Sequence, residues 1–299
     1  MTSQVMEAFA LPALWCRSMS LMPFAPSVTA PVGAQLRDWR QRRRLSQLDL
    51  AGEADISTRH LSFLETGRAL PSREMLIRLA ETLEVPLRER NALLAAAGYA
   101  PMYRERPLDD PALACARRAV DLVLKGHEPY PALAVDRHWN LLAHNRAVAP
   151  FLAGVDPSLL GPPVNVLRLS LHPRGMAPRI VNLAQWRAHL IARLRQQVAA
   201  SADRTLAALL DELVAYSTPD AEHDPAPGRL DATGGVAVPL SMRAADGSVL
   251  SFISTTTVFG TPVDITLSEL ALETFFPADE ATAQALRRLG DGQAAADAS

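Results

Sequence analysis

The sequence predicts two domains, an all-helical one over residues 32–100 and an α+β one over residues 112–289. A chain of 299 residues is long enough for about two domains. Up to residue 100, apolar residues recur at helical spacing in short segments bounded by Ser, Pro or Gly. After Pro129, short runs typical of strands alternate with helical segments. Residues 101–111 are rich in Pro and charge and are predicted to form a linker.

The first domain is predicted to contain five short helices. Ser46, Ser57 and Ser72 each precede an apolar stretch and can cap a helix N-terminus. The first helix is expected to close at Leu45, and Gly67 is a typical C-terminal stop for the third. Apolar side chains three or four residues apart are expected to form one core. They include Leu36, Trp39, Leu50, Leu61, Leu64, Met75, Leu76, Leu79, Leu83, Leu93 and Leu94.

The second domain mixes helices and strands. The run SFISTTTVF is rich in the β-branched residues that strands prefer, and a turn at residues 245–248 precedes it. A second turn, at Asp136-Arg137-His138, is expected to separate two short strands. The predicted strands are 131–136, 139–143, 236–243, 249–259 and 270–276, and the predicted helices are 110–126, 145–152, 182–200, 203–216 and 279–289.

Both ends of the chain are predicted to be disordered. Residues 1–31 are apolar and nearly uncharged, but they lack a basic residue before Arg17, and Pro12, Pro23 and Pro26 interrupt them. These features disfavour a signal peptide. No apolar run reaches the roughly 18 residues that a membrane span needs, so no membrane partner is expected. The tail 290–299 is small and polar, and it is expected to be disordered.

Charge is distributed unevenly between the two parts. Residues 33–106 hold 13 basic and 10 acidic residues, whereas residues 107–299 hold 16 basic and 21 acidic ones. This asymmetry favours an anionic partner for the first domain alone. Cys16 and Cys115 form no CxxC pair, and the seven histidines are scattered. We therefore expect a reduced, cytoplasmic protein with no metal site and no cofactor.

A set of residues from Ser46 to Ala80 falls at the fixed spacing of a known family. These residues are Ser46-Gln47, Leu50-Ala51, Ile56-Ser57, Leu61, Leu64-Glu65, Gly67-Arg68, Pro71 and Leu79-Ala80. With them, the segment from Leu36 to Val85 resembles the Cro/C1-type (xenobiotic-response-element) helix-turn-helix family. The resemblance implies an all-α, lambda-repressor-like domain in which the third helix enters the DNA major groove and the second crosses the backbone.

Polar residues at the start of the third helix are the candidates for contacting double-stranded DNA. Arg59 can donate two hydrogen bonds to a guanine and is the first candidate for base contact. The further candidates there are Ser57, Thr58, His60 and Ser62. Gln47 resembles the family's phosphate-anchoring glutamine. Phosphate contacts are also expected from Arg43, Arg44 and Arg68.

Each candidate has a structural alternative. The run Arg42–Arg44 can equally be a solvated helix end, and Ser57 can be an N-cap alone. His60 is as compatible with solvent as with DNA. Glu65 is interpreted as a structural residue that bonds within the domain.

A second resemblance extends over both domains and is carried by five blocks of sequence. These blocks are STRHLSFLETGRALPSRE, RNALLAAAGYAP, AVDRHWNLLAHNRA, LHPRGMAPRIVN and FGTPVDITLSELALETFFPAD. With them, the chain from Gly33 to about Leu289 resembles the MmyB-like regulators. These join a helix-turn-helix to a PAS-like ligand-binding domain, which implies that fold for residues 112–289. The resemblance carries no residue-level ligand code to this sequence.

A small sheet with helices across it can enclose an apolar cavity. We expect its ligand to be small and hydrophobic. The candidate wall residues are Trp139, Phe151, Trp186, Leu190, Phe252 and Phe275, each of which can instead be plain core. The candidate polar anchors are His144, His172 and Arg179.

The sequence thus predicts a homodimeric, ligand-responsive transcription regulator. An alternative is a repressor whose second domain serves only dimerisation or protein contact. No catalytic residue is expected, because the sequence has no G-x-S-x-G, HExxH, P-loop or dinucleotide fingerprint.

Overall fold

The computed structural model describes residues 30–217 and 238–297, with side chains described as far as Asp291. The predicted leader therefore lies outside the described residues, except for its last two. Within the described part, no helix combines the length and the apolar character needed to cross a membrane.

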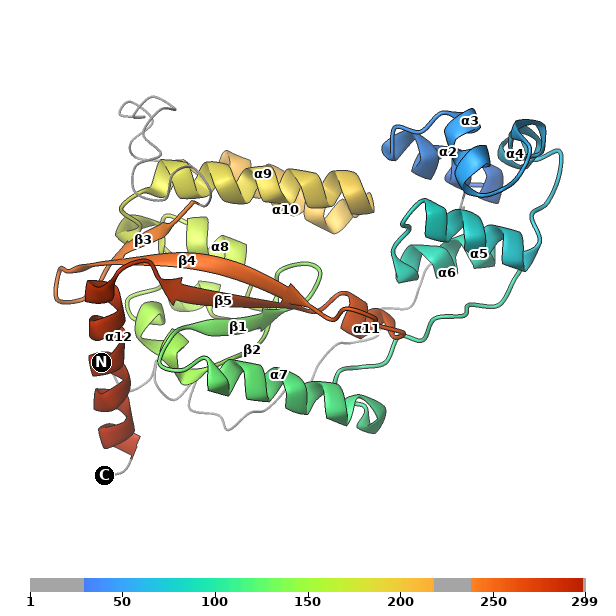
Figure 1. The fold of residues 1–299 in the computed structure, drawn as a ribbon. Helices are drawn as coiled ribbons and strands as arrows, with labels where there is room; N and C mark the ends of the chain where they lie inside the picture. Colours follow the sequence, from blue (N-terminus) through green and yellow to red (C-terminus); the bar gives the residue numbers. More distant parts are fainter. Residues whose placement is uncertain (1–29, 218–237, 298–299) are drawn as a thin grey trace.

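Five helices form the first domain, as the sequence predicts (Figure 1). Ser46, Ser57 and Ser72 each accept a hydrogen bond from a backbone N–H of the first turn, which confirms all three as N-caps. Leu45 lies beyond the end of the first helix, at Arg42, rather than inside it. The helices are α2 (Val32–Arg42), α3 (Gln47–Glu53), α4 (Thr58–Glu65), α5 (Arg73–Thr82) and α6 (Leu87–Ala96).

The core of this domain requires a close approach of α2 to α4. A Cβ atom on Gly33 would lie 2.2 Å from the carbonyl oxygen of Leu64. No side chain fits at that distance, so glycine permits the contact between the two backbones. Leu36, Leu61 and Leu64 are fully buried beside it.

The second domain is built on a five-stranded antiparallel sheet in the order β2-β1-β5-β4-β3. Its hairpin turn at residues 245–248 is confirmed, with Gly247 at φ +84°. Together with the surrounding helices, this sheet confirms the predicted α+β class. The strands are β1 (Ala132–Val135), β2 (Leu141–His144), β3 (Leu240–Arg243), β4 (Val249–Val258) and β5 (Ala271–Pro277).

Helices cover both faces of the sheet (Figure 1). On β1, Leu133 and Val135 point to a core shared with α9 (Leu183–Ser201) and α10 (Arg204–Ala215). The alternate residues Ala132 and Ala134 face α7 (Ala114–Gly126). Because successive side chains of a strand point to opposite faces of the sheet, each face packs against its own apolar core. The remaining helices are α8 (Val166–Leu171), α11 (Ile265–Ser268) and α12 (Glu280–Asp297).

Some predicted boundaries are wrong. Helix α12 continues to Asp297, so the predicted disordered tail is helical for most of its length. The predicted helix 145–152 is a 3₁₀ helix, η2 (Arg146–Leu152), which contains Pro150. The sequence also missed the short helices α8 and α11 and the 3₁₀ turns η3 (Pro157–Leu159) and η4 (Ala177–Arg179). Another 3₁₀ turn, η1 (Pro111–Leu113), precedes α7.

Candidate DNA interface and ligand cavity

Helix α4 presents a polar face opposite its buried leucines. Ser57 and Arg59 are exposed and Thr58, His60 and Ser62 are half-buried, so the predicted contact residues remain accessible at one surface. Ser57 Oγ accepts a hydrogen bond from the His60 backbone N–H at 3.1 Å. Ser57 therefore caps the helix and is also exposed at the surface.

Two arginines flank an aromatic ring at this surface. The guanidinium carbons of Arg59 and Arg68 lie 5.4 Å and 5.9 Å from the ring centre of Phe63. The ring therefore places two cations close together, one from the start of α4 and one after its end. Sequence reasoning missed Phe63, although its position four residues after Arg59 puts both on one helix face.

The other predicted phosphate contacts differ in how they are held. Arg43 donates to the carbonyl oxygens of Leu83 and Glu84, at 2.8 and 3.0 Å, and so caps the end of α5. Gln47 donates its side-chain amide to Glu65 at 2.8 Å. Arg44 is exposed and has a positive φ of 57°. Arg43 and Gln47 thus have structural roles, whereas Arg44 extends into solvent.

The second domain contains a partly open, apolar cavity of about 110 Å³ between the sheet, α8 and α9. All five predicted aromatic residues lie in its wall. They come from the turn before β2, η2, α9, β4 and β5, which are far apart in sequence. These residues are Trp139, Phe151, Trp186, Phe252 and Phe275.

Hydrogen bonds fix the two tryptophans in this wall. Trp139 Nε1 donates to Gln197 at 2.8 Å, and Trp186 Nε1 donates to the hydroxyl of Ser170 at 3.1 Å. Trp139 also adopts a positive φ of 66°, a conformation that is unfavourable for a bulky residue. Since both indole N–H groups have partners, the rings can line an apolar space without leaving a donor unsatisfied.

One ion pair interrupts the apolar wall. Arg193 donates to Glu273 at 2.7 Å and to the Thr256 hydroxyl at 2.6 Å, and its guanidinium lies 4.6 Å from the ring centre of Trp139. Glu273 is almost fully buried, so its charge is balanced mainly by Arg193. Arg193 and Glu273 thus add a charged pair to a wall that is otherwise mainly apolar.

Sequence reasoning missed this pair, although two signals indicated it. Arg193 follows Trp186 by seven residues, which places both on one face of α9. Glu273 precedes Phe275 by two residues, which places both on one face of β5.

The predicted polar anchors lie elsewhere. Arg179 donates to the carbonyl oxygens of Phe151 and Ala153 and lines a second, more polar cavity of about 360 Å³ that shares Phe151 with the first. His144 bonds the Asn145 carbonyl oxygen through Nδ1, and His172 packs edge-on against Tyr216. Neither histidine lines the apolar cavity. Among the described residues, no cluster of three His, Cys, Asp or Glu is arranged to hold a metal ion.

Comparison with known families agrees with this architecture. Residues 31–93 match a helix-turn-helix domain, and residues 116–289 match the MmyB-like transcription regulator ligand binding domain. Comparison with curated proteins found no match. The first match covers α2 to most of α6, and the second covers the sheet and its cavity. Because the second match spans more than half of the chain, the protein belongs to the MmyB-like transcription regulators, with a DNA-binding domain followed by a ligand-binding domain.

Proposed function

We propose that this protein is a cytoplasmic, sequence-specific regulator that binds DNA as a homodimer and responds to a small hydrophobic effector. The observation that supports the effector most directly is the apolar cavity with one charged pair in its wall. Binding, rather than catalysis, is the function we propose for this domain. Two helix-turn-helix heads in a dimer must match half-sites about 34–36 Å apart, so a change in their relative placement alters DNA affinity.

For the DNA contact, we propose that Arg59 binds a base in the major groove and that Arg68 positions the phosphate backbone. Arg59 is exposed, close to the start of α4, and steadied by Phe63. Thr58, His60 and Ser62 are the neighbouring contacts, and Arg44 is a phosphate contact. Arg43 and Gln47 support this surface by fixing α5 and Glu65.

Replacing Arg59 by Ala is expected to weaken binding to the preferred site by about 1–3 kcal/mol, roughly 5- to 150-fold, because a bidentate base contact is lost. The site would first be identified by capturing genomic fragments on the full chain at physiological salt, and affinities would then be measured on it. Arg78→Ala is the matched control, because Arg78 is an exposed arginine on α5. Equal affinities for the two variants would contradict the role of Arg59.

For the effector, the cavity size favours a small apolar molecule or the end of a longer one. A cavity of about 110 Å³ is somewhat smaller than the roughly 150 Å³ apolar cavity that binds benzene in an engineered protein. The ion pair of Arg193 and Glu273 offers hydrogen bonds to a single polar group at one side. We therefore expect a ligand with an apolar body and one polar end.

Straight-chain alcohols and the matching carboxylic acids, of six to twelve carbons, are the probes for this site. We expect some of them to raise the melting temperature, to change tryptophan fluorescence through Trp139 and Trp186, and to change DNA affinity. Val166 lines the cavity, so Val166→Phe should abolish these effects, whereas Val123→Phe, at an exposed position on α7, should not. If no probe changes stability or DNA affinity, the alternative of a purely dimerising domain is favoured.

A further inference from the structure

The two domains come together where α6 and α11 are neighbours (Figure 1), and hydrogen bonds from Arg88 join them there. In the described residues, each apolar core cluster lies within one domain, and none joins the two. The contact is made by α6 of the DNA-binding domain and α11 of the ligand-binding domain. A polar contact of this kind allows the domains to change their relative placement more easily than a shared apolar core would.

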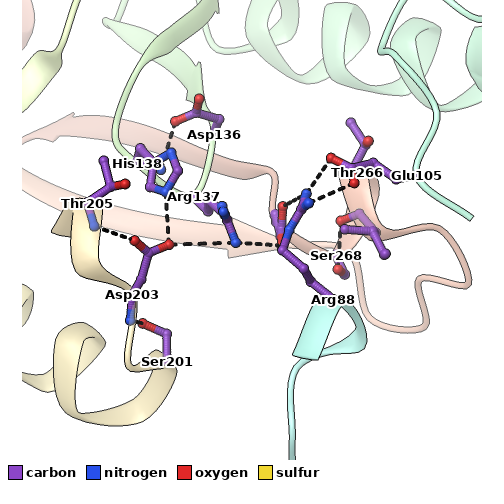
Figure 2. A network of polar contacts seen from close by, with 12 residues as sticks. Arg88, Glu105, Asp136, Arg137, His138, Ser201, Asp203, Thr205, Thr266 and Ser268 are labelled. Carbon is purple, nitrogen blue, oxygen red and sulfur yellow. Dashed lines mark hydrogen bonds and ion pairs between the residues drawn. The ribbon is translucent and has the colours of Figure 1, made fainter. Parts of the chain in front are cut away.

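Arg88 on α6 is the centre of this contact (Figure 2). Its guanidinium donates to both carboxylate oxygens of Glu269, just after α11, at 2.8 and 2.9 Å. It also donates to both oxygens of Glu105 in the linker. One side chain of the DNA-binding domain thus holds two separate segments of the rest of the chain.

Glu269 continues the network into the ligand-binding domain. Arg137 lies 3.4 Å from Glu269 and 3.6 Å from Asp203, and the His138 ring contacts Asp203 at 2.9 Å (Figure 2). Asp203 in turn caps α10 by accepting from the backbone N–H of Thr205. We call Arg88, Glu105, Arg137, Asp203 and Glu269 the ionic cluster.

Two members of the ionic cluster, Arg137 and Asp203, lie next in the chain to elements of the cavity wall. Arg137 and His138 directly precede Trp139, whose ring lines the cavity. Asp203 follows α9, the helix that supplies Trp186 and Arg193 to the wall and Gln197 to the Trp139 indole. A movement of Trp139 or α9 therefore displaces Arg137 or Asp203 directly.

We propose that the ionic cluster couples the occupancy of the apolar cavity to the placement of the DNA-binding domain. The role of this coupling in regulation rests on the proposed function. The coupling itself lies within the chain and can be measured without ligand or DNA. The pairs are partly exposed and share partners, so Glu269 can redistribute between Arg88 and Arg137. The contact between the domains then has two arrangements, one with Glu269 on Arg88 and one with Glu269 on Arg137. Occupancy of the cavity can favour one of them.

The test measures the distance between the domains without any ligand. Spin labels are placed at Glu74→Cys on α5 and Asp211→Cys on α10, both exposed, in a full chain carrying Cys16→Ser and Cys115→Ser. Labelled protein is diluted with unlabelled protein, and pulsed EPR gives the distance distribution. We expect Arg88→Gln and Glu269→Gln each to broaden the distribution, since both break the Arg88–Glu269 link. The double variant should broaden it by less than the sum of the two, because that link can be lost only once. Arg174→Gln, which breaks an exposed pair inside the ligand-binding domain, should leave it unchanged.

A second arm fills the cavity by mutation. Val166 donates its backbone N–H to the Trp139 carbonyl oxygen, so Val166→Phe should push on Trp139 and shift the distribution. The shift should vanish when Arg88→Gln and Glu269→Gln are added. Leu133→Phe, from β1, provides the same filling if Val166→Phe does not fold. A narrow distribution in the Arg88→Gln/Glu269→Gln chain, no shift on filling, or a shift that survives loss of the ion pairs would overturn the proposal. Because no ligand or DNA is used, these outcomes are independent of the probe and capture experiments.

Discussion

Replacing Glu65 by Gln is expected to lower the stability of the DNA-binding domain by about 3–5 kcal/mol, because it removes one partner of a buried ion pair. Arg40 donates to both carboxylate oxygens of Glu65, at 2.6 and 2.9 Å, and Gln47 donates to one of them. Arg40 and Glu65 are 8% and 7% exposed, so a neutral partner would leave the arginine charge buried and poorly balanced. The pair joins the end of α2 to the end of α4 and so positions α4, the helix that we propose contacts DNA.

Acid provides an independent check of the same pair. Burial disfavours the charged form of Glu65, but hydrogen bonds from Arg40 and Gln47 outweigh it and hold the pKa below the ordinary value. A carboxyl whose pKa is lower in the folded state stabilises the fold above its unfolded pKa. That contribution is lost as pH falls through the folded pKa. The Glu65→Gln variant should therefore lose less stability than the parent in this acidic range.

Hydrogen exchange in α2 and α4 is the suitable measurement, because it reports the opening free energy of this domain separately from the other. Asp38→Asn is the matched control. It removes an exposed pair with Arg42 at i,i+4 spacing and is expected to cost about 0.5 kcal/mol or less. Equal protection in the two variants would mean that the buried pair does not stabilise the domain.

The DNA-binding domain could be predicted because its signals are local. Each serine cap and each leucine stripe lies within one helix, and a family resemblance supported the same helices. The structural interpretation of Glu65 is confirmed as well. Its partner could not be identified, because Arg40 is one of 13 arginines in residues 33–106, and only the crossing of α2 over α4 brings the two together.

The ligand cavity was harder to predict because its wall comes from many elements. Large aromatic side chains tend to be buried, and this tendency found the five aromatic wall residues. The same tendency does not predict which polar side chains line a cavity. The chemistry of His144 and His172 suits a polar anchor, but neither residue lines the apolar cavity, and their rings contact Asn145 and Tyr216 instead. The ionic cluster was equally hidden, since Arg88 and Glu269 are 181 residues apart.

Asn145 shows how a local signal can indicate the wrong role. Asn145 lies at a strand-to-helix junction, where asparagine is typical of an N-cap, but its side chain makes no cap hydrogen bond to η2. Instead Oδ1 accepts from the Ala132 N–H at 3.1 Å, and Nδ2 donates to the carbonyl oxygens of Leu124 and Tyr130 at 3.0 and 2.8 Å. One buried side chain thus ties the end of α7 to the start of β1.

Replacing Asn145 by Ala is therefore expected to destabilise the ligand-binding domain by about 3–5 kcal/mol, because three backbone groups lose their partner at a buried site. Asn145→Asp should be at least as damaging. A carboxylate can still accept from Ala132, but it cannot donate, and its charge would face two carbonyl oxygens. Asn140→Ala is the control, because the Asn140 amide donates only one short bond, to Asp136. Urea unfolding should rank Asn140→Ala well above both Asn145 variants in stability. If Asn145→Asp proved more stable than Asn145→Ala, acceptance from Ala132 would outweigh the two donated bonds, and the tie between α7 and β1 would depend on that one contact.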